Sequence, residues 1–103
     1  MLETCTHSTF NNLTDRKFTI YHGSDQPLET ELIEVGDLVE TNRQEMFAIY
    51  FRVPDGVIPA QGSYKLVNSE LGELILLLVP VIHDESIIYE AVFNRLKKKK
   101  PTA

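Results

Sequence analysis

The segment of residues 73–94 constrains the fold of this chain more than any other. Residues 74–82 form an uninterrupted apolar run, and as an extended strand this run is apolar on both faces. The turn-forming residues 83–86 follow, and a second strand then carries apolar side chains on one face, at Ile87, Tyr89, Ala91 and Phe93. The pattern predicts a β-hairpin whose first strand has one more apolar face than the core of a small sheet can bury.

Alternation of apolar and polar residues recurs along the rest of the chain and predicts an all-β fold. The clearest case is 45–53, which Pro54 ends, and a bulge or bend is expected at Gly36-Asp37. The expected strands are 17–21, 29–38, 45–53, 63–68, 74–81 and the strand that begins near Ile87. Since the connections are short, we expect a six-stranded antiparallel meander that forms a small barrel or a sandwich.

A short helical turn is expected before the first strand, within residues 8–14. Phe10 and Leu13 stand three positions apart there, so both can point from the turn into one open end of the sheet. The 103 residues suffice for one domain with a single core, which we place at residues 8–95. The flanking residues 1–7 and 96–103 are expected to be flexible.

Composition narrows the class of protein further. The apolar run is far shorter than the ~20 residues of a membrane helix, and the N-terminus lacks the features of a secretory signal, so we expect a cytoplasmic protein. The single cysteine, Cys5, cannot form an intramolecular disulfide. His22 and the segment His83-Asp84-Glu85 come nearest to a metal cluster. Because neighbouring residues on a strand point to opposite faces, no metal site is expected.

Charge is distributed unevenly along the chain. Residues 1–94 contain all 15 acidic residues and five of the 10 basic residues, which gives them a formal charge of −10. Arg95 and the run from Lys97 to Lys100 supply the remaining positive charge. Because an acidic body repels phosphate backbones, nucleic acid is not expected as a partner. The lysine run is typical of a solubilising tail, and contact with RNA, an anionic membrane or the acidic body of another copy are its alternative roles.

Five spaced motifs give the chain a family resemblance. They are Phe47-Ala-Ile-Tyr-Phe-Arg, Gln61-Gly-Ser-Tyr-Lys-Leu, Leu71-Gly-Glu-Leu, Leu78-Val-Pro-Val and Tyr89-Glu-Ala-Val-Phe-Asn. In these motifs, spread over residues 10–94, the chain resembles a family of short bacterial domains of uncharacterised function. The resemblance implies a bacterial stand-alone β domain with no assigned activity and no assigned cofactor. The lysine run lies outside the shared pattern.

The second apolar face of strand 74–81 is the main functional candidate. The terminal turn, the loop at Val57-Ile58 or a second sheet could cover this face within the monomer. The other interpretation is a surface for self-association or for another protein, because large exposed apolar patches are uncommon on monomers. We favour this second hypothesis, a non-enzymatic structural or protein-interaction module that forms a homo-oligomer. The candidate interface residues are Ile75, Leu77, Val79 and Val81.

The alternative hypothesis is a small-ligand-binding β-barrel whose mouth is lined by Tyr50, Arg52 and Tyr64. Barrels of this size are usually filled by their own side chains, which leaves little room for a ligand. An enzyme is the least favoured class. A nucleophile would need a base and an orienting group, and no motif in the sequence supplies them. We therefore expect no catalytic residue and no cofactor.

Overall fold

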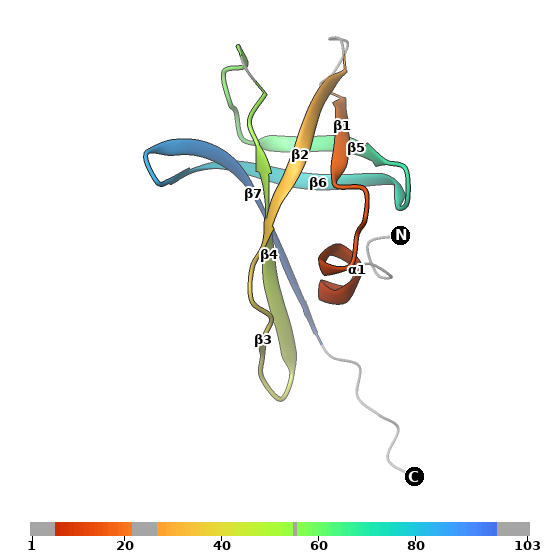
Figure 1. The fold of residues 1–103 in the computed structure, drawn as a ribbon. Coiled ribbons are helices and arrows are strands. Elements are labelled where there is room, and N and C mark those ends of the chain that lie inside the picture. Colours follow the sequence, from red (N-terminus) through yellow and green to blue (C-terminus); the bar gives the residue numbers. More distant parts are fainter. Residues whose placement is uncertain (1–5, 22–26, 55, 97–103) are drawn as a thin grey trace.

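The computed structural model describes residues 6–21, 27–54 and 56–96, and it confirms an all-β barrel (Figure 1). In these residues one short helix, α1 (His7–Asn11), precedes seven strands. The strands are β1 (Lys17–Tyr21), β2 (Leu28–Val35), β3 (Val39–Glu40), β4 (Gln44–Arg52), β5 (Gly62–Asn68), β6 (Gly72–His83) and β7 (Ser86–Leu96).

Six of the strands close into an antiparallel ring. Their order is β2-β1-β5-β6-β7-β4, and pairing between β2 and β4 completes the ring, while β3 pairs with β4 outside it. The order differs from one continuous meander. Two meanders, β1-β2-β4 and β5-β6-β7, are joined through β1–β5 and β4–β7. As a result β5 and β6 run across β4 and β7 (Figure 1).

Strand β2 changes its partner half-way along its length. Its first half pairs with β1 and its second half with β4, and the register shifts between Leu32 and Glu34. The extra residue, Ile33, forms a β-bulge that bends the strand towards its new partner. A second irregularity confirms the predicted bulge or bend at Gly36-Asp37: three residues separate Val35, which is opposite Ile49, from Val39, which is opposite Met46, while β4 has only two residues between these partners. The short strand β3, which follows the end of β2 at Val35, was not predicted.

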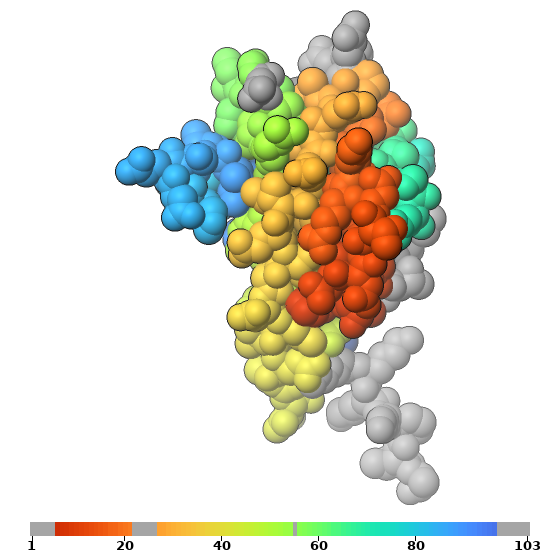
Figure 2. Space-filling view, in the orientation of Figure 1, coloured from red at the N-terminus to blue at the C-terminus, as the bar shows by residue number. Residues whose placement is uncertain are grey.

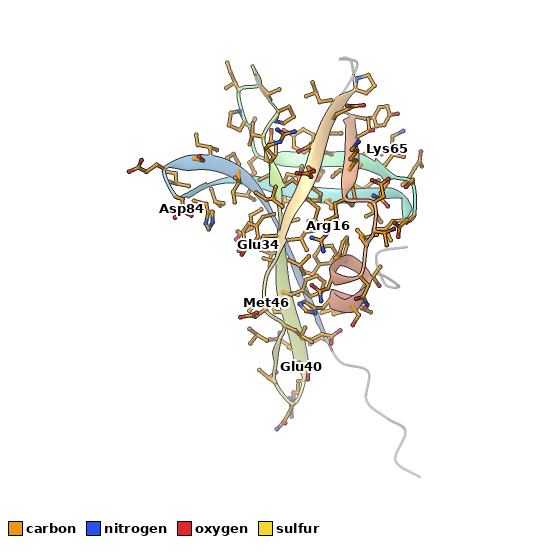
Figure 3. The ribbon with its side chains drawn as sticks, in the orientation of Figure 1. Arg16, Glu34, Glu40, Met46, Lys65 and Asp84 are labelled. Atoms are coloured by element: carbon orange, nitrogen blue, oxygen red, sulfur yellow. The ribbon has the colours of Figure 1, made fainter. Side chains whose placement is uncertain are left out.

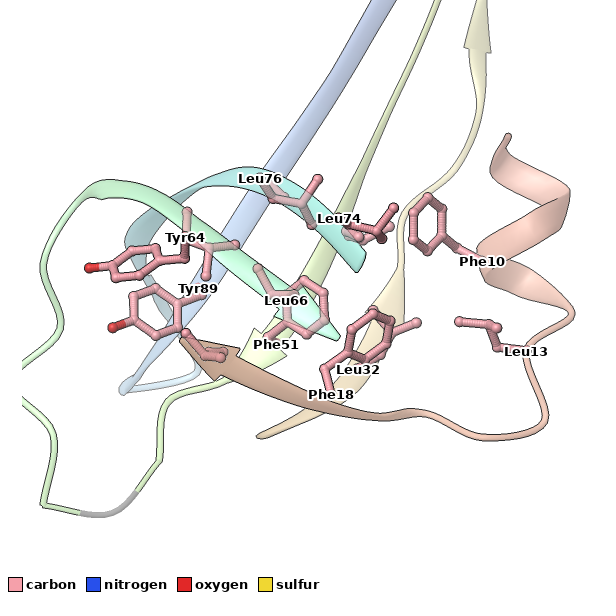
Figure 4. Packing of buried hydrophobic residues seen from close by; sticks show 14 of the residues in the cluster. Phe10, Leu13, Phe18, Leu32, Phe51, Tyr64, Leu66, Leu74, Leu76 and Tyr89 are labelled. Carbon is pink, nitrogen blue, oxygen red and sulfur yellow. The ribbon is translucent and has the colours of Figure 1, made fainter. Parts of the chain in front are cut away.

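Side chains from every strand of the ring fill the barrel (Figure 4). The leucines at the even positions of β6 point inward, as predicted, while their odd-numbered neighbours point outward. Phe18 and Phe51 meet edge to face, with ring centroids 5.0 Å apart. The largest fully buried side chains are Phe10, Phe18, Phe51, Leu32, Ile49, Leu66, Leu74 and Leu78.

Helix α1 closes one end of the barrel. Phe10 is fully buried and Leu13 is 7% exposed, which confirms that both plug the core from the N-terminal segment. The ring of Phe10 lies 5.1 Å from that of Phe93 on β7. Nε2 of His7 lies 2.8 Å from the carbonyl oxygen of Gly36, so the helix is also tied to the end of β2.

The ends of the described chain belong to the fold. Thr6 caps α1, because its Oγ1 accepts a hydrogen bond from the backbone N–H of Thr9 at 3.2 Å. Strand β7 continues to Leu96. The rest of the termini that we expect to be flexible, residues 1–5 and 97–103, lies outside the described residues.

The turn between β5 and β6 is fastened to the body by Asn68, which is 2% exposed. Its Nδ2 donates hydrogen bonds to the backbone carbonyls of Asp15 and Lys17, each at 3.0 Å. Its Oδ1 accepts from the backbone N–H groups of Glu70 at 2.8 Å and Leu71 at 3.0 Å. One buried amide therefore joins this turn to the connection between α1 and β1.

Two carboxylates extend the same polar cluster. Oε1 of Glu70 accepts hydrogen bonds from the hydroxyl of Thr14 and from the backbone N–H of Asp15, and these bonds hold the pKa of Glu70 below its ordinary value. The Ser69 hydroxyl, followed by the backbone N–H of Lys17, lowers the pKa of Asp15 in the same way. Both carboxylates are thus held in the ionised form by groups that the fold positions.

Candidate functional site

Strands β6 and β7 are joined along only part of their length. Their ladder joins residues 79–83 to residues 86–90. Residues 72–78 of β6 pair with β5, whereas β7 runs beside β4. The two strands therefore diverge, and over residues 72–78 and 91–96 their facing edges have no strand partner within the described part of the chain. We call this opening the seam.

A groove of about 310 Å³ lies over the seam. Its floor includes Phe93, whose ring stacks parallel on that of Phe47 with centroids 4.9 Å apart. Phe10 contacts Phe93 from the core, so the groove ends on packed aromatic side chains rather than opening into the barrel. The lining residues are Ile75, Leu76, Leu77, Ala91, Val92, Phe93, Asn94 and Arg95.

The walls of the groove carry exposed apolar side chains. Ile75 is 64% exposed, Leu77 is 53% exposed and Val92 is 57% exposed. The loop that could have covered this face does not do so through Ile58, which is itself 91% exposed. The outward face of β6 thus remains accessible at Ile75 and Leu77, as the interface hypothesis requires.

The other two predicted interface residues lie elsewhere on β6. Val79 and Val81 are half-buried, in the part of the strand that pairs with β7. Val81 lines a separate hollow of about 210 Å³ together with Glu34 and Tyr50. The structure therefore brings two of the four predicted interface residues, Ile75 and Leu77, into the groove.

The three predicted ligand-binding residues do not share one mouth. Tyr50 lines the hollow beside Val81, where burial raises the pKa of its phenol and a hydrogen bond with Glu90 raises it further. Arg52 lines a different hollow of about 390 Å³. Tyr64 is buried in the core, and its hydroxyl donates to the carbonyl of Ala60 at 2.6 Å. Each of the three has a separate environment.

Sequence reasoning missed two apolar residues at the tip of the β6–β7 hairpin. The hairpin projects from the barrel (Figures 1 and 2). Ile82 is 81% exposed and lies directly opposite Ile87, which is 50% exposed. The signal was present, because the apolar run continues to Ile82. The strand was expected to end at Val81 and the turn to begin at His83, so Ile82 was assigned to neither.

A comparison with known protein families gives a match over nearly the whole fold. The model of a domain of unknown function, DUF6916, matches residues 5–93. The chain belongs to the DUF6916 family. A search of curated proteins and a search of solved structures each gave no match. The predicted resemblance to an uncharacterised domain family is confirmed, and the matched range includes most of the seam.

The described residues of this DUF6916 domain also bear on metal binding and on membrane spans. Among residues 6–21, 27–54 and 56–96, no three His, Cys, Asp or Glu side chains are grouped so that they could hold a metal ion. The same residues contain no helix with the length and apolar character to cross a membrane. Cys5, His22 and the lysine run at 97–100 lie outside the described residues.

Proposed function

We propose that this DUF6916 domain is a non-enzymatic protein-interaction module that self-associates through the groove over the seam. The observation that carries the proposal is the exposure of Ile75, Leu77 and Val92 around a groove with a packed aromatic floor. Contiguous exposed apolar patches are uncommon on monomeric proteins and usually mark contact surfaces.

The backbone at the seam gives a second reason to expect a partner. Along residues 72–78 and 91–96 the facing edges of β6 and β7 lack a strand partner among the described residues. Open strand edges favour contact with another chain unless charged residues or proline protect them. The exposed apolar side chains of these edges are Ile75, Leu77, Val92 and Leu96, and the charged residues, Glu73 and Arg95, stand near the outer ends of the two segments. A protein surface can therefore cover the apolar walls and the open edges together.

The magnitude of the apolar contribution limits what the groove can do alone. Full burial of one such side chain stabilises by ~1.5–3 kcal/mol. Since Ile75, Leu77 and Val92 are 64%, 53% and 57% exposed, covering all three contributes about 3–5 kcal/mol. Association of two molecules costs ~4–15 kcal/mol in lost translational and rotational freedom. A stable complex of two copies must therefore bury a further surface besides the groove walls.

Substitution of Leu77 by glutamate tests the proposal. Because Leu77 is 53% exposed, Leu77→Glu should fold with an unchanged circular dichroism spectrum and a similar melting temperature. The same carboxylate at an apolar interface should weaken association at least about a hundredfold, which is about 2.7 kcal/mol. Light scattering over a wide concentration range measures the weakening.

Ile58→Glu is the matched control, because it places the same charge on an exposed apolar residue away from the groove. It should associate like the unmodified chain. The proposal fails if Leu77→Glu associates as well as Ile58→Glu. It also fails if Leu77→Glu unfolds the domain, since Leu77 would then belong to the core.

A further inference from the structure

The projecting β6–β7 hairpin is the second apolar feature of the surface. Ile82 and Ile87 lie opposite each other on its ladder, and we call this pair the knob. Figure 2 shows the hairpin standing clear of the barrel, and Figure 3 places Asp84 at its end. An exposed pair of isoleucines on a projecting arm suits insertion into a concave apolar site.

The turn of the hairpin has a backbone conformation that Asp84 adopts readily but that Glu85 does not favour. Asp84 has φ 47° and Glu85 has φ 68°. Two successive residues with positive φ are typical of a type I′ turn, in which Asn-Gly is the preferred pair and a glutamate is strained. The chain therefore presents two carboxylates at the tip, and that of Glu85 comes at a conformational cost. Strain of this kind is a reason to look for a contact made by the residues that bear it.

Charge differs between the two ends of the β6–β7 pair. The hairpin carries Asp84, Glu85 and Glu90, and no lysine or arginine stands between Lys65 and Arg95 in the sequence. At the groove end, Lys65 lies opposite Ile75 and pairs with Glu73 at 3.5 Å, and Arg95 pairs with Glu45 at 2.8 Å. Four further lysines follow Leu96 in the sequence. The described charges at the groove end are thus balanced pairs, and the strand that borders the groove leads in the sequence into a run of positive charge, opposite in sign to the acidic tip.

The sizes of the knob and the groove agree. An apolar cavity of ~150 Å³ holds one benzene molecule. The groove of about 310 Å³ therefore has room for two side chains of similar size, such as Ile82 and Ile87.

A chain cannot place its own knob in its own groove. Ile82 lies five residues beyond Leu77, about 17 Å along the same strand at ~3.3 Å per residue. The hairpin also leads away from the barrel (Figure 1). The occupant must therefore come from another molecule, and the apolar knob with its acidic tip supplies a complementary one.

We propose that the β6–β7 hairpin of one copy inserts its knob into the groove of the next copy. This inference rests on the proposed self-association and names the contact that achieves it. The contact is heterologous, since two different surfaces meet, and repetition of it gives a ring or an open chain of copies. It also supplies the additional buried surface that the groove walls require, because Ile82 and Ile87 become covered together with Ile75, Leu77 and Val92.

Mixing two variants tests the inference. Leu77→Glu places a charge in the groove and keeps the knob intact. Ile82→Glu places a charge on the knob and keeps the groove intact. Each variant alone should be a monomer of 11.8 kDa. An equimolar mixture contains one intact knob and one intact groove, so light scattering should show a complex of about twice that mass and nothing larger.

The possible results separate the inference from the proposed function. If Ile82→Glu alone associates like the unmodified chain, or if the mixture stays monomeric while the unmodified chain associates, the knob-in-groove contact is wrong and self-association stands. If the unmodified chain is itself monomeric, both are wrong. Ile87→Glu provides a second knob variant with the same expected behaviour, should Ile82→Glu fail to fold.

Discussion

The two turns at the ends of β6 are built in opposite ways. The turn before β6 is held against the body by the buried side chain of Asn68, and its positive φ of 76° is taken by Gly72, the residue type that adopts it most easily. The turn after β6 projects from the barrel and gives its positive φ values to Asp84 and Glu85. The first turn places a glycine where φ is positive, and the second places a glutamate there, at an exposed position.

The difference separates the parts of β6 that maintain the fold from the parts available for contact. Near the first turn, carboxylates such as Glu70 are held by backbone N–H groups, and the neighbouring Leu74 is 2% exposed. Near the second turn, Asp84 and Glu85 are exposed and Ile82 is 81% exposed. Stability and function often compete at a site in this manner. The second turn is therefore the end of β6 that is accessible for contact.

Among the substitutions that test this difference between the two turns, the largest change in the free energy of unfolding is expected at Asn68. Asn68→Ala removes the acceptor and the donors that four backbone groups use, so it should lower the free energy of unfolding by about 3 kcal/mol, measured by urea denaturation. Asn42→Ala, the same change at an exposed residue, should cost less than about 0.5 kcal/mol. Equal, small losses for the two variants would remove the structural role assigned to the first turn.

A smaller effect of opposite sign is expected at Glu85. Glu85→Gly relieves about 1 kcal/mol of backbone strain at φ 68° but makes the unfolded chain more flexible, so the net gain in stability should be about 0.5 kcal/mol. Loss of the carboxylate should at the same time weaken self-association, most clearly at low salt. Urea denaturation and light scattering measure the two quantities on one sample.

Gly72→Ala is the control for the Glu85 prediction. No atom lies within 4 Å of the added methyl group, so its cost of about 1 kcal/mol comes from the backbone at φ 76° alone. Association should not change in this variant. If Glu85→Gly gains stability and association is unchanged, the glutamate only destabilises the turn and the acidic tip has no part in the contact.

The features of the fold that depend on local pattern could be predicted from the sequence. Alternation along β6 gave the buried leucines and the outward Ile75 and Leu77, and the spacing of Phe10 and Leu13 gave the plug. Both follow from side-chain directions that a strand or a helical turn fixes by itself. For the same reason Ile75 and Leu77, the groove residues on β6, could be predicted from the sequence.

The features that depend on pairing between distant strands could not be predicted. The seam exists because β7 pairs with β4 rather than following β6 along its whole length, and nothing local to either strand encodes that choice. Tyr64 was expected to line a ligand-binding mouth, but its hydroxyl donates to the carbonyl of Ala60 and its ring lies in the core. The knob was missed because strand ends are uncertain by a few residues.

The most direct test of the central claim is the molar mass of the unmodified chain in solution, measured by size exclusion with light scattering from low micromolar to millimolar concentration. Self-association through the seam predicts a mass that rises with concentration to two or more times 11.8 kDa. A mass that stays at 11.8 kDa over the whole range would contradict it.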